Sequence, residues 1–228
     1  MSKSSTKQRQ GSVSTKRQDA ILIDMESVTL RWGSQVPDDA GAARTRLVEM
    51  AELCFNQKGI LQTSIEDIAR AAQVSRATVY RYFDGRDDLV LAVILRTADR
   101  YLNRIRPHVD EFDSLADVVV EWIVRTERAA RRDASLSLLF NVEGARVTGS
   151  IIAGSSVALF ERVTEFFRPY FERFDDEVRQ EVDVQTASEW ILRMLLSLLT
   201  VEGPRRRSQD GERLLLRTYL VPAICNMD

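Results

Sequence analysis

The sequence is poor in the residues on which most catalytic and metal sites depend. It contains a single histidine, His108, among 228 residues, which disfavours a histidine-based catalytic triad and a metal site built from several histidines. It also has no glycine-rich phosphate loop and no Cys-x-x-Cys pair. We therefore expect no enzyme activity, no catalytic residues, no metal and no cofactor.

Cysteines and long apolar runs are equally scarce. Cys54 and Cys225 are the only cysteines, and both lie in apolar stretches that are predicted to be helical. Two cysteines do not make a disulfide framework in a chain of this length, so a reduced cytoplasmic protein is the simplest interpretation. No run of about eighteen apolar residues exists, which predicts that the chain does not enter a membrane.

The total charge gives no sign of a DNA-binding protein, but the local charge does. The net charge is −2, yet residues 1–18 carry five cations and no acid. Residues 70–86 carry four arginines against Asp84 alone. Because a local basic face matters more for DNA binding than the total charge, these two segments are candidates for contact with nucleic acid.

Composition and periodicity divide the chain into three parts. Residues 1–42 are polar and basic and end in a stretch with proline and glycine, which predicts a disordered extension and linker. From residue 43 onward apolar residues recur at spacings of three and four, which is typical of helices. We expect an all-α fold, with an N-terminal three-helix helix-turn-helix domain over residues 43–86 and a C-terminal helical effector-binding and dimerisation domain over residues 87–228.

A helix-turn-helix is predicted within residues 65–82. Ser64 and Asp67 have the spacing of a capping box, and Thr63 and Glu66 repeat it one residue earlier. Ser75 is placed to cap the second helix. Ala69 supplies the small side chain that two crossing helices need where they meet.

The two faces of the predicted second helix differ in chemistry. Its inner face joins an apolar set from both helices: Ile65, Ile68, Ala72, Val74 and Val79. Its outer face carries Arg76, Ala77, Thr78, Tyr80, Arg81 and Tyr82. Arginine can bond guanine edges or phosphates, hydroxyl groups can bond phosphate oxygens, and a small alanine lets the helix approach the groove closely.

These residues carry a resemblance to a known family. The stretches T-S-I-E-D-I-A, V-S-R-A-T-V-Y-R-Y-F and D-G-R-D-D-L, within residues 43–94, resemble the DNA-binding domain of the TetR (tetracycline-repressor-like) family. The resemblance implies that the second helix enters the major groove. It also implies that Thr78, Tyr80 and Tyr82 lie on phosphates, with Arg76, Ala77 and Arg81 near base edges or backbone.

Two positions depart from the usual family pattern. Arg86 stands where the family commonly has a phosphate-binding lysine at the start of the fourth helix. Gln73 stands at a turn position usually held by glycine, where a left-handed conformation would cost about 1 kcal/mol. The expected DNA-contact set is Thr63, Ser64, Ser75, Arg76, Ala77, Thr78, Tyr80, Arg81, Tyr82 and Arg86.

The basic tail has two interpretations. It can add phosphate or minor-groove contacts, as other N-terminal arms do. It can equally be a solvated tail with weak, salt-sensitive attraction to DNA.

The rest of the chain is predicted to be helical and to hold two copies together. Helices are expected at residues 87–107, 114–132, 135–141, 156–174, 183–200 and 210–225. The last two are apolar on more than one face, so that each can bury one face against a partner. The family resemblance implies a homodimer through these two helices, and the alternative is a monomer with an internal helix pair. The two DNA-binding domains of such a dimer would bind a palindrome whose half-sites lie roughly 34–36 Å apart.

The middle helices are expected to enclose an effector cavity. The candidate ligand contacts are Trp122, Arg125, Phe140, Phe160 and Phe167. A mostly apolar cavity with few polar groups suits a small hydrophobic effector. The alternative is that these aromatic residues belong to an ordinary core.

The sequence therefore predicts a ligand-responsive transcriptional repressor that binds a palindromic double-stranded DNA operator and releases it when the effector binds. The long helix from Asp87 would transmit the change from cavity to DNA. An activator of the same architecture, and a small-molecule-binding or interaction protein with a degenerate DNA-reading head, are the alternatives.

Overall fold

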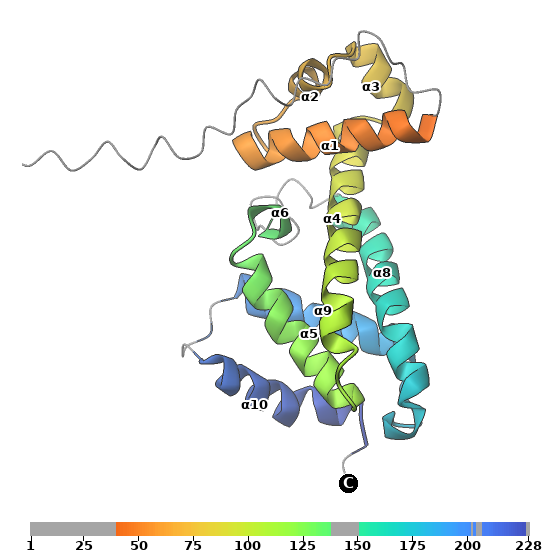
Figure 1. The fold of residues 1–228 in the computed structure, drawn as a ribbon, viewed down its shortest axis with the longest axis vertical. Coiled ribbons are helices and arrows are strands. Elements are labelled where there is room, and N and C mark those ends of the chain that lie inside the picture. Colours follow the sequence, from red (N-terminus) through yellow and green to blue (C-terminus); the bar gives the residue numbers. More distant parts are fainter. Residues whose placement is uncertain (1–39, 138–150, 202, 204–206, 227–228) are drawn as a thin grey trace, which may run out of the picture. The chain divides into compact units, whose positions relative to one another are not determined.

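The computed structural model describes residues 40–137, 151–201, 203 and 207–226. Within these ranges the chain is all-α, as predicted, and forms no β-strand beyond an isolated bridge between Val178 and Cys225. Figure 1 shows the helices: α1 (Ala40–Lys58), α2 (Ile65–Ala71), α3 (Arg76–Tyr82), α4 (Arg86–Val109), α5 (Leu115–Ala130), α6 (Ala134–Ser137), α8 (Ile151–Arg173), α9 (Val184–Thr200) and α10 (Gln209–Tyr219). Short 3-10 turns follow α8 (Asp175–Glu177) and α10 (Val221–Ala223).

The first three helices and the start of α4 pack around one core, which we call the head. Each element contributes side chains that are almost completely buried: Leu47 and Phe55 of α1, Ile68 of α2, Val79 of α3 and Leu89 of α4. In Figure 1, α1 crosses the N-terminal end of α4, and α2 and α3 lie at the opposite end of the helices from α10. The head therefore holds α3 against a single packed core.

The second half of α4 packs with α5, α8, α9 and α10 around a separate core, which we call the body. At its centre the ring of Trp122 meets that of Phe167 edge-on at 5.1 Å between centroids, and Phe167 meets Phe166 at 5.2 Å. Such edge-to-face contacts are the favoured geometry for buried aromatic rings. All three side chains are at most 2% exposed, so this aromatic cluster is fully buried in the body.

Ion pairs hold α10 against α5. Arg213 bonds the carboxylate of Glu121, with its Nη2 3.2 Å from Oε2, and Arg217 pairs with Asp117 one turn away. The hydrogen bond from Arg213, which opposes the effect of burial, lowers the pKa of Glu121 below its usual value. Glu121 is only 8% exposed, so it is a buried carboxylate with its charge partners in place.

Helix α4 belongs to both cores. Its 24 residues would span about 36 Å at the usual rise per residue. Leu89 and Val93 lie in the head core, whereas Tyr101 and Ile105 lie in the body core. The long helix expected from Asp87 is therefore present and connects head and body.

Most of the expected helices are found, with shifted ends. Helix α8 starts at Ile151, five residues before the expected residue 156. Helix α10 ends at Tyr219 and gives way to a 3-10 turn that contains Pro222, because proline has no N–H to continue the helical ladder. The expected helix at 135–141 is seen as α6, and its last residues lie outside the described part, as do residues 1–39 with the basic tail.

None of the described helices combines the length and the apolar character needed to cross a bilayer. The described ranges also contain no group of three or more His, Cys, Asp or Glu side chains placed to hold a metal ion.

Candidate functional site

The start of α2 is fixed by a capping box. Ser64 Oγ accepts a hydrogen bond from the Asp67 N–H at 3.1 Å, and Asp67 Oδ2 accepts from the Ser64 N–H at 3.1 Å. Lys58, the last residue of α1, also donates to Asp67, with 2.8 Å between Nζ and Oδ1. The hydrogen bonds from Lys58 and Ser64 hold the pKa of Asp67 well below its usual value. Of the two capping boxes that the sequence allows, the structure forms the one between Ser64 and Asp67.

The turn between α2 and α3 contains Gln73, for which the sequence indicated a possible left-handed conformation. Gln73 has φ +57°, which is the left-handed region, and it is the one non-glycine residue with positive φ in the described chain. The N–H of Val74 bonds the carbonyl of Ala69 at 2.9 Å across this turn. The two helices therefore cross through a turn in which Gln73 adopts a strained conformation, whereas glycine would adopt the same conformation without strain.

Replacing Gln73 with glycine should stabilise the protein. We expect the free energy of unfolding to rise by about 0.5–1 kcal/mol, because glycine adopts positive φ without a steric penalty. Gln73→Ala keeps the strain and serves as the control, with no comparable gain. Chemical denaturation of the three proteins measures the difference, and a glycine variant no more stable than the alanine variant would contradict the account.

The start of α3 is capped by Ser75. Its Oγ accepts from the Thr78 N–H at 3.1 Å and lies 2.9 Å from the Thr78 hydroxyl. Ser75 is exposed and Thr78 is half-buried. The cap thus leaves two hydroxyl groups together at the outer edge of α3.

The two sides of α3 differ as the sequence predicts. Val79 is completely buried in the head core, whereas Tyr80 is 50% exposed. Arg81 is exposed and lies over the ring of Tyr82, 4.9 Å from its centroid, with its Nη2 3.2 Å from the Tyr82 hydroxyl. Tyr82 is half-buried and also packs against the head core. The outer face therefore gathers cations, hydroxyl groups and the small exposed Ala77.

Arg76 opens α3 and is paired within the head. It forms an ion pair with Glu66 of α2, and both side chains are about half exposed. The guanidinium also lies 6.0 Å from the ring centroid of Tyr80. A surface ion pair of this kind is weak, so a phosphate or a guanine edge can compete for Arg76 at little cost.

Thr63 and Arg86 are placed differently from the other candidates. Thr63 is 2% exposed, and its hydroxyl donates to the carbonyl of Gly59 at 2.8 Å. The guanidinium of Arg86 donates to the carbonyls of Thr63 and Ile60, with 3.0 Å from Nε to Thr63 O. Both side chains tie the loop before α2 to the rest of the head, so neither is free for phosphate in this arrangement.

Two further exposed cations belong to the head and were not in the predicted set. Arg44 of α1 is exposed and lies over the ring of Phe83, directly after α3, at 4.6 Å from its centroid. Arg70, at the end of α2, is 77% exposed and 3.5 Å from Asp67. Arg70 lay within the basic segment counted in the sequence. Arg44 could not be found in this way, because only the packing of α1 brings it to α3.

The body holds a small apolar cavity beside Trp122. Its volume is about 20 Å³, and its wall includes Trp122, Tyr101, Leu136 and Val163. The Tyr101 hydroxyl donates to Thr126 Oγ1 at 2.8 Å, and burial raises the pKa of Tyr101 to about 12. The indole N–H of Trp122 is buried without a hydrogen-bond partner among the described residues.

Of the other four predicted ligand residues, the three that the structure describes do not line this cavity. Arg125 is directed to Glu121, with 3.2 Å between Nε and Oε2. Phe167 is completely buried in the aromatic cluster, and Phe160 lies under Arg193 of α9, 5.7 Å from its guanidinium carbon. Phe140 lies outside the described residues. The ordinary-core alternative thus fits Phe167 better than the ligand role.

Apolar side chains remain uncovered on the outer faces of α8, α9 and α10. They are Val157 of α8, Trp190 of α9, Val201 directly after α9, and Leu214 and Tyr219 of α10, all between 47% and 73% exposed. Much of the apolar stripe along α9 is buried in the body core, including Ala187, Ile191 and Leu195. The sequence predicts that α9 buries one face in its own domain and the other against a partner, and these side chains form the face toward its own domain.

Comparison with known proteins agrees with this geometry. Residues 47–93 match the family described as bacterial regulatory proteins, tetR family. An uncharacterized HTH-type transcriptional regulator of Mycobacterium tuberculosis is 29% identical over 182 residues, which cover 80% of this chain and 85% of that protein.

Solved structures share the fold. The TetR family repressor AlkX from a Dietzia strain, implicated in biodegradation of n-alkanes, has a TM-score of 0.58 at 20% identity and covers 79% of this chain and 94% of its own. RolR in complex with resorcinol has a TM-score of 0.57 at 16% identity, and the match covers 81% of this chain and 88% of RolR. Residues 47–93 thus match the tetR family of bacterial regulatory proteins, and the chain as a whole is similar to a helix-turn-helix transcriptional regulator and shares its fold with a TetR family repressor.

Proposed function

We propose that the protein is a dimeric repressor that holds a palindromic DNA operator and releases it when a small hydrophobic effector binds. The outer face of α3 carries this proposal, because it presents guanidinium and hydroxyl groups while Val79 anchors the opposite side in the core. A rigid helix with that division can enter a major groove without unfolding any part of the head.

The contacts divide by chemistry. Hydroxyl groups of Thr78, Tyr80 and Tyr82 donate to phosphate oxygens and set the position of the helix, whereas Arg76 and Arg81 reach base edges. Arg86 acts indirectly, by fixing the loop before α2. The proposed contact set is Ser64, Ser75, Arg76, Ala77, Thr78, Tyr80, Arg81 and Tyr82, with Arg44 and Arg70 added as phosphate contacts.

The homodimer is proposed to form through α9 together with the outer face of α8. Arg193 of α9 lies over Phe160 of α8, so the outer faces of these two helices are continuous. Trp190 of α9 is 47% exposed, and a large aromatic side chain of this kind is typical of the centre of an interface. The dimer was expected to involve α10 as well as α9, and α10, with Leu214 exposed, remains the alternative surface.

The effector is proposed to enter beside Trp122. A cavity of about 20 Å³ holds about one water, whereas ligand cavities are usually some 300–1,000 Å³. Binding must therefore move helices of the body, and α4 is among the elements that line the cavity. Because α4 also belongs to the head core, a shift in the body changes the position of α3. We place the boundary between head and body within α4, after Val93.

Selection of bound DNA from a random pool tests the proposal. The full-length protein should enrich an inverted repeat whose half-site centres lie about one helical turn apart. A reporter placed behind that site should be less active when the protein is present. Enrichment of no sequence at low salt would overturn the DNA-reading proposal and favour a degenerate head. A reporter that becomes more active would identify an activator instead.

A further inference from the structure

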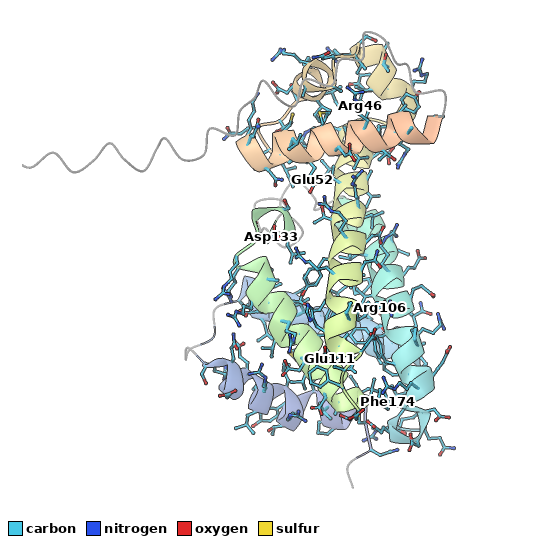
Figure 2. The ribbon with its side chains drawn as sticks, viewed as in Figure 1. Arg46, Glu52, Arg106, Glu111, Asp133 and Phe174 are labelled. Atoms are coloured by element: carbon cyan, nitrogen blue, oxygen red, sulfur yellow. The ribbon has the colours of Figure 1, made fainter. Side chains whose placement is uncertain are left out.

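A second cavity lies beside the head and differs from the apolar cavity near Trp122. Its volume is about 390 Å³, and it is bounded by α1, α4, α6 and the link between α5 and α6. Figure 2 labels Glu52 on α1 and Asp133 before α6, one on each side of this space. The polar residues that line it are Glu52, Thr97, Arg100, Arg104, Asp133 and Ser135. Its size is that of a small-molecule site.

Thr97 of α4 carries an unsatisfied group in this wall. The residue is 5% exposed, and its hydroxyl has no hydrogen-bond partner among the described residues. A helical threonine usually bonds the carbonyl four residues earlier, and Thr97 does not. Burying an unpaired hydroxyl costs about 1–3 kcal/mol, so the site gains from a molecule that supplies the missing bond.

The charges of the cavity are already balanced. Arg100 pairs with Glu52, and Arg104 lies 3.5 Å from Asp133. The Glu52 side chain is 9% exposed, so separating it from Arg100 would leave a buried carboxylate without its partner. Because each arginine already has an acidic partner, these four side chains carry no net charge, and a net-neutral molecule can add hydrogen bonds to both pairs.

We propose that this cavity is a second ligand site and that it takes a small, net-neutral molecule rich in hydroxyl or amide groups. Tyr101 and Leu136 line both cavities, so this site adjoins the proposed effector cavity without coinciding with it. The ligand bonds the Thr97 hydroxyl and the two ion pairs at once. Its chemistry is opposite to that of the hydrophobic effector.

The site also bridges head and body. Asn56 of α1 donates to the Ser135 hydroxyl at 2.9 Å across the same gap. A ligand that touches both sides favours one orientation of the head. Its effect on DNA, which rests on the proposed function, is therefore a coupling: DNA and ligand change each other's affinity by the same factor.

Calorimetric titration of the full-length protein tests the site. The probes are net-neutral monosaccharides, polyols and simple amides, compared with acetate, inorganic phosphate, alkylammonium ions and benzene. At least one neutral polar probe should bind saturably, and Thr97→Val should weaken it at least tenfold while remaining folded. Thr97→Ser restores the hydroxyl and should restore binding. Ser188→Ala removes a buried, unpartnered hydroxyl outside this cavity and should change nothing.

Three outcomes would overturn the site: no binding by any neutral polar probe, tighter binding by a charged or apolar probe, or equal binding by the Thr97→Val variant. None of them depends on DNA. Failure of the repressor proposal appears separately, as a protein that titrates the polar probe normally but selects no DNA sequence.

Discussion

The double variant Thr78→Val and Tyr80→Phe will bind operator DNA about 100-fold more weakly than the parent. Each substitution removes one hydroxyl from the outer face of α3 with little change in shape. A hydrogen bond to a charged phosphate contributes about 1.5 kcal/mol, which is about tenfold in affinity for each residue. Because phosphate contacts carry no sequence information, the preferred operator sequence should stay the same. Fluorescence anisotropy with the selected site and with mismatched sites measures both effects.

A matched control lies on α10. Thr218→Val and Tyr219→Phe make the same chemical changes at exposed positions far along the chain from α3. This control should bind DNA like the parent. The Ser75 cap accepts from the Thr78 backbone, so the α3 variant should also keep its helix and its stability. Parent-like operator binding by the α3 variant would show that the hydroxyl groups are not phosphate contacts.

Replacing Trp190 with glutamate will separate the dimer and reduce operator affinity by at least ~100-fold. A charge at the centre of an apolar interface is buried without a partner, which opposes association. A single head then binds one half-site and loses the gain in effective concentration that a linked second head provides. Analytical ultracentrifugation at micromolar concentration measures the mass, and the anisotropy titration measures the affinity.

Leu214→Glu on α10 is the corresponding control for the alternative surface. Leu214 is 66% exposed, so the substitution introduces the same charge without disturbing the core. We expect this variant to remain dimeric. If Leu214→Glu dissociates and Trp190→Glu does not, the interface lies on α10. If both remain dimeric with parent-like affinity, neither surface carries the dimer.

The head could be predicted from sequence almost in full, because its structure depends on local rules. The capping serines, the buried Val79 and the left-handed Gln73 each follow from the spacing of a few neighbouring residues. The exposed face of α3 follows from the same helical period. What could not be predicted locally is which polar side chains turn inward, as Thr63 and Arg86 do.

The body was predicted only in outline, because its arrangement depends on contacts between distant segments. The apolar pattern gave the helices but could not tell the core side of α9 from its outer side. The predicted ligand residues included Trp122, which lines the apolar cavity, and also Phe167, which lies in the core. Arg125 looked like a polar anchor until the position of α10 placed Arg213 on the same carboxylate. The polar cavity at Thr97 has no local sequence signature at all.

Hydroxyl-radical footprinting of the full-length protein on its selected DNA tests the central claim most directly. If paired copies of α3 occupy successive major grooves, the footprint will show two protected blocks related by two-fold symmetry. Their centres will lie about one helical turn, some 10 base pairs, apart. A single asymmetric block, or no protection at low salt, would contradict the account.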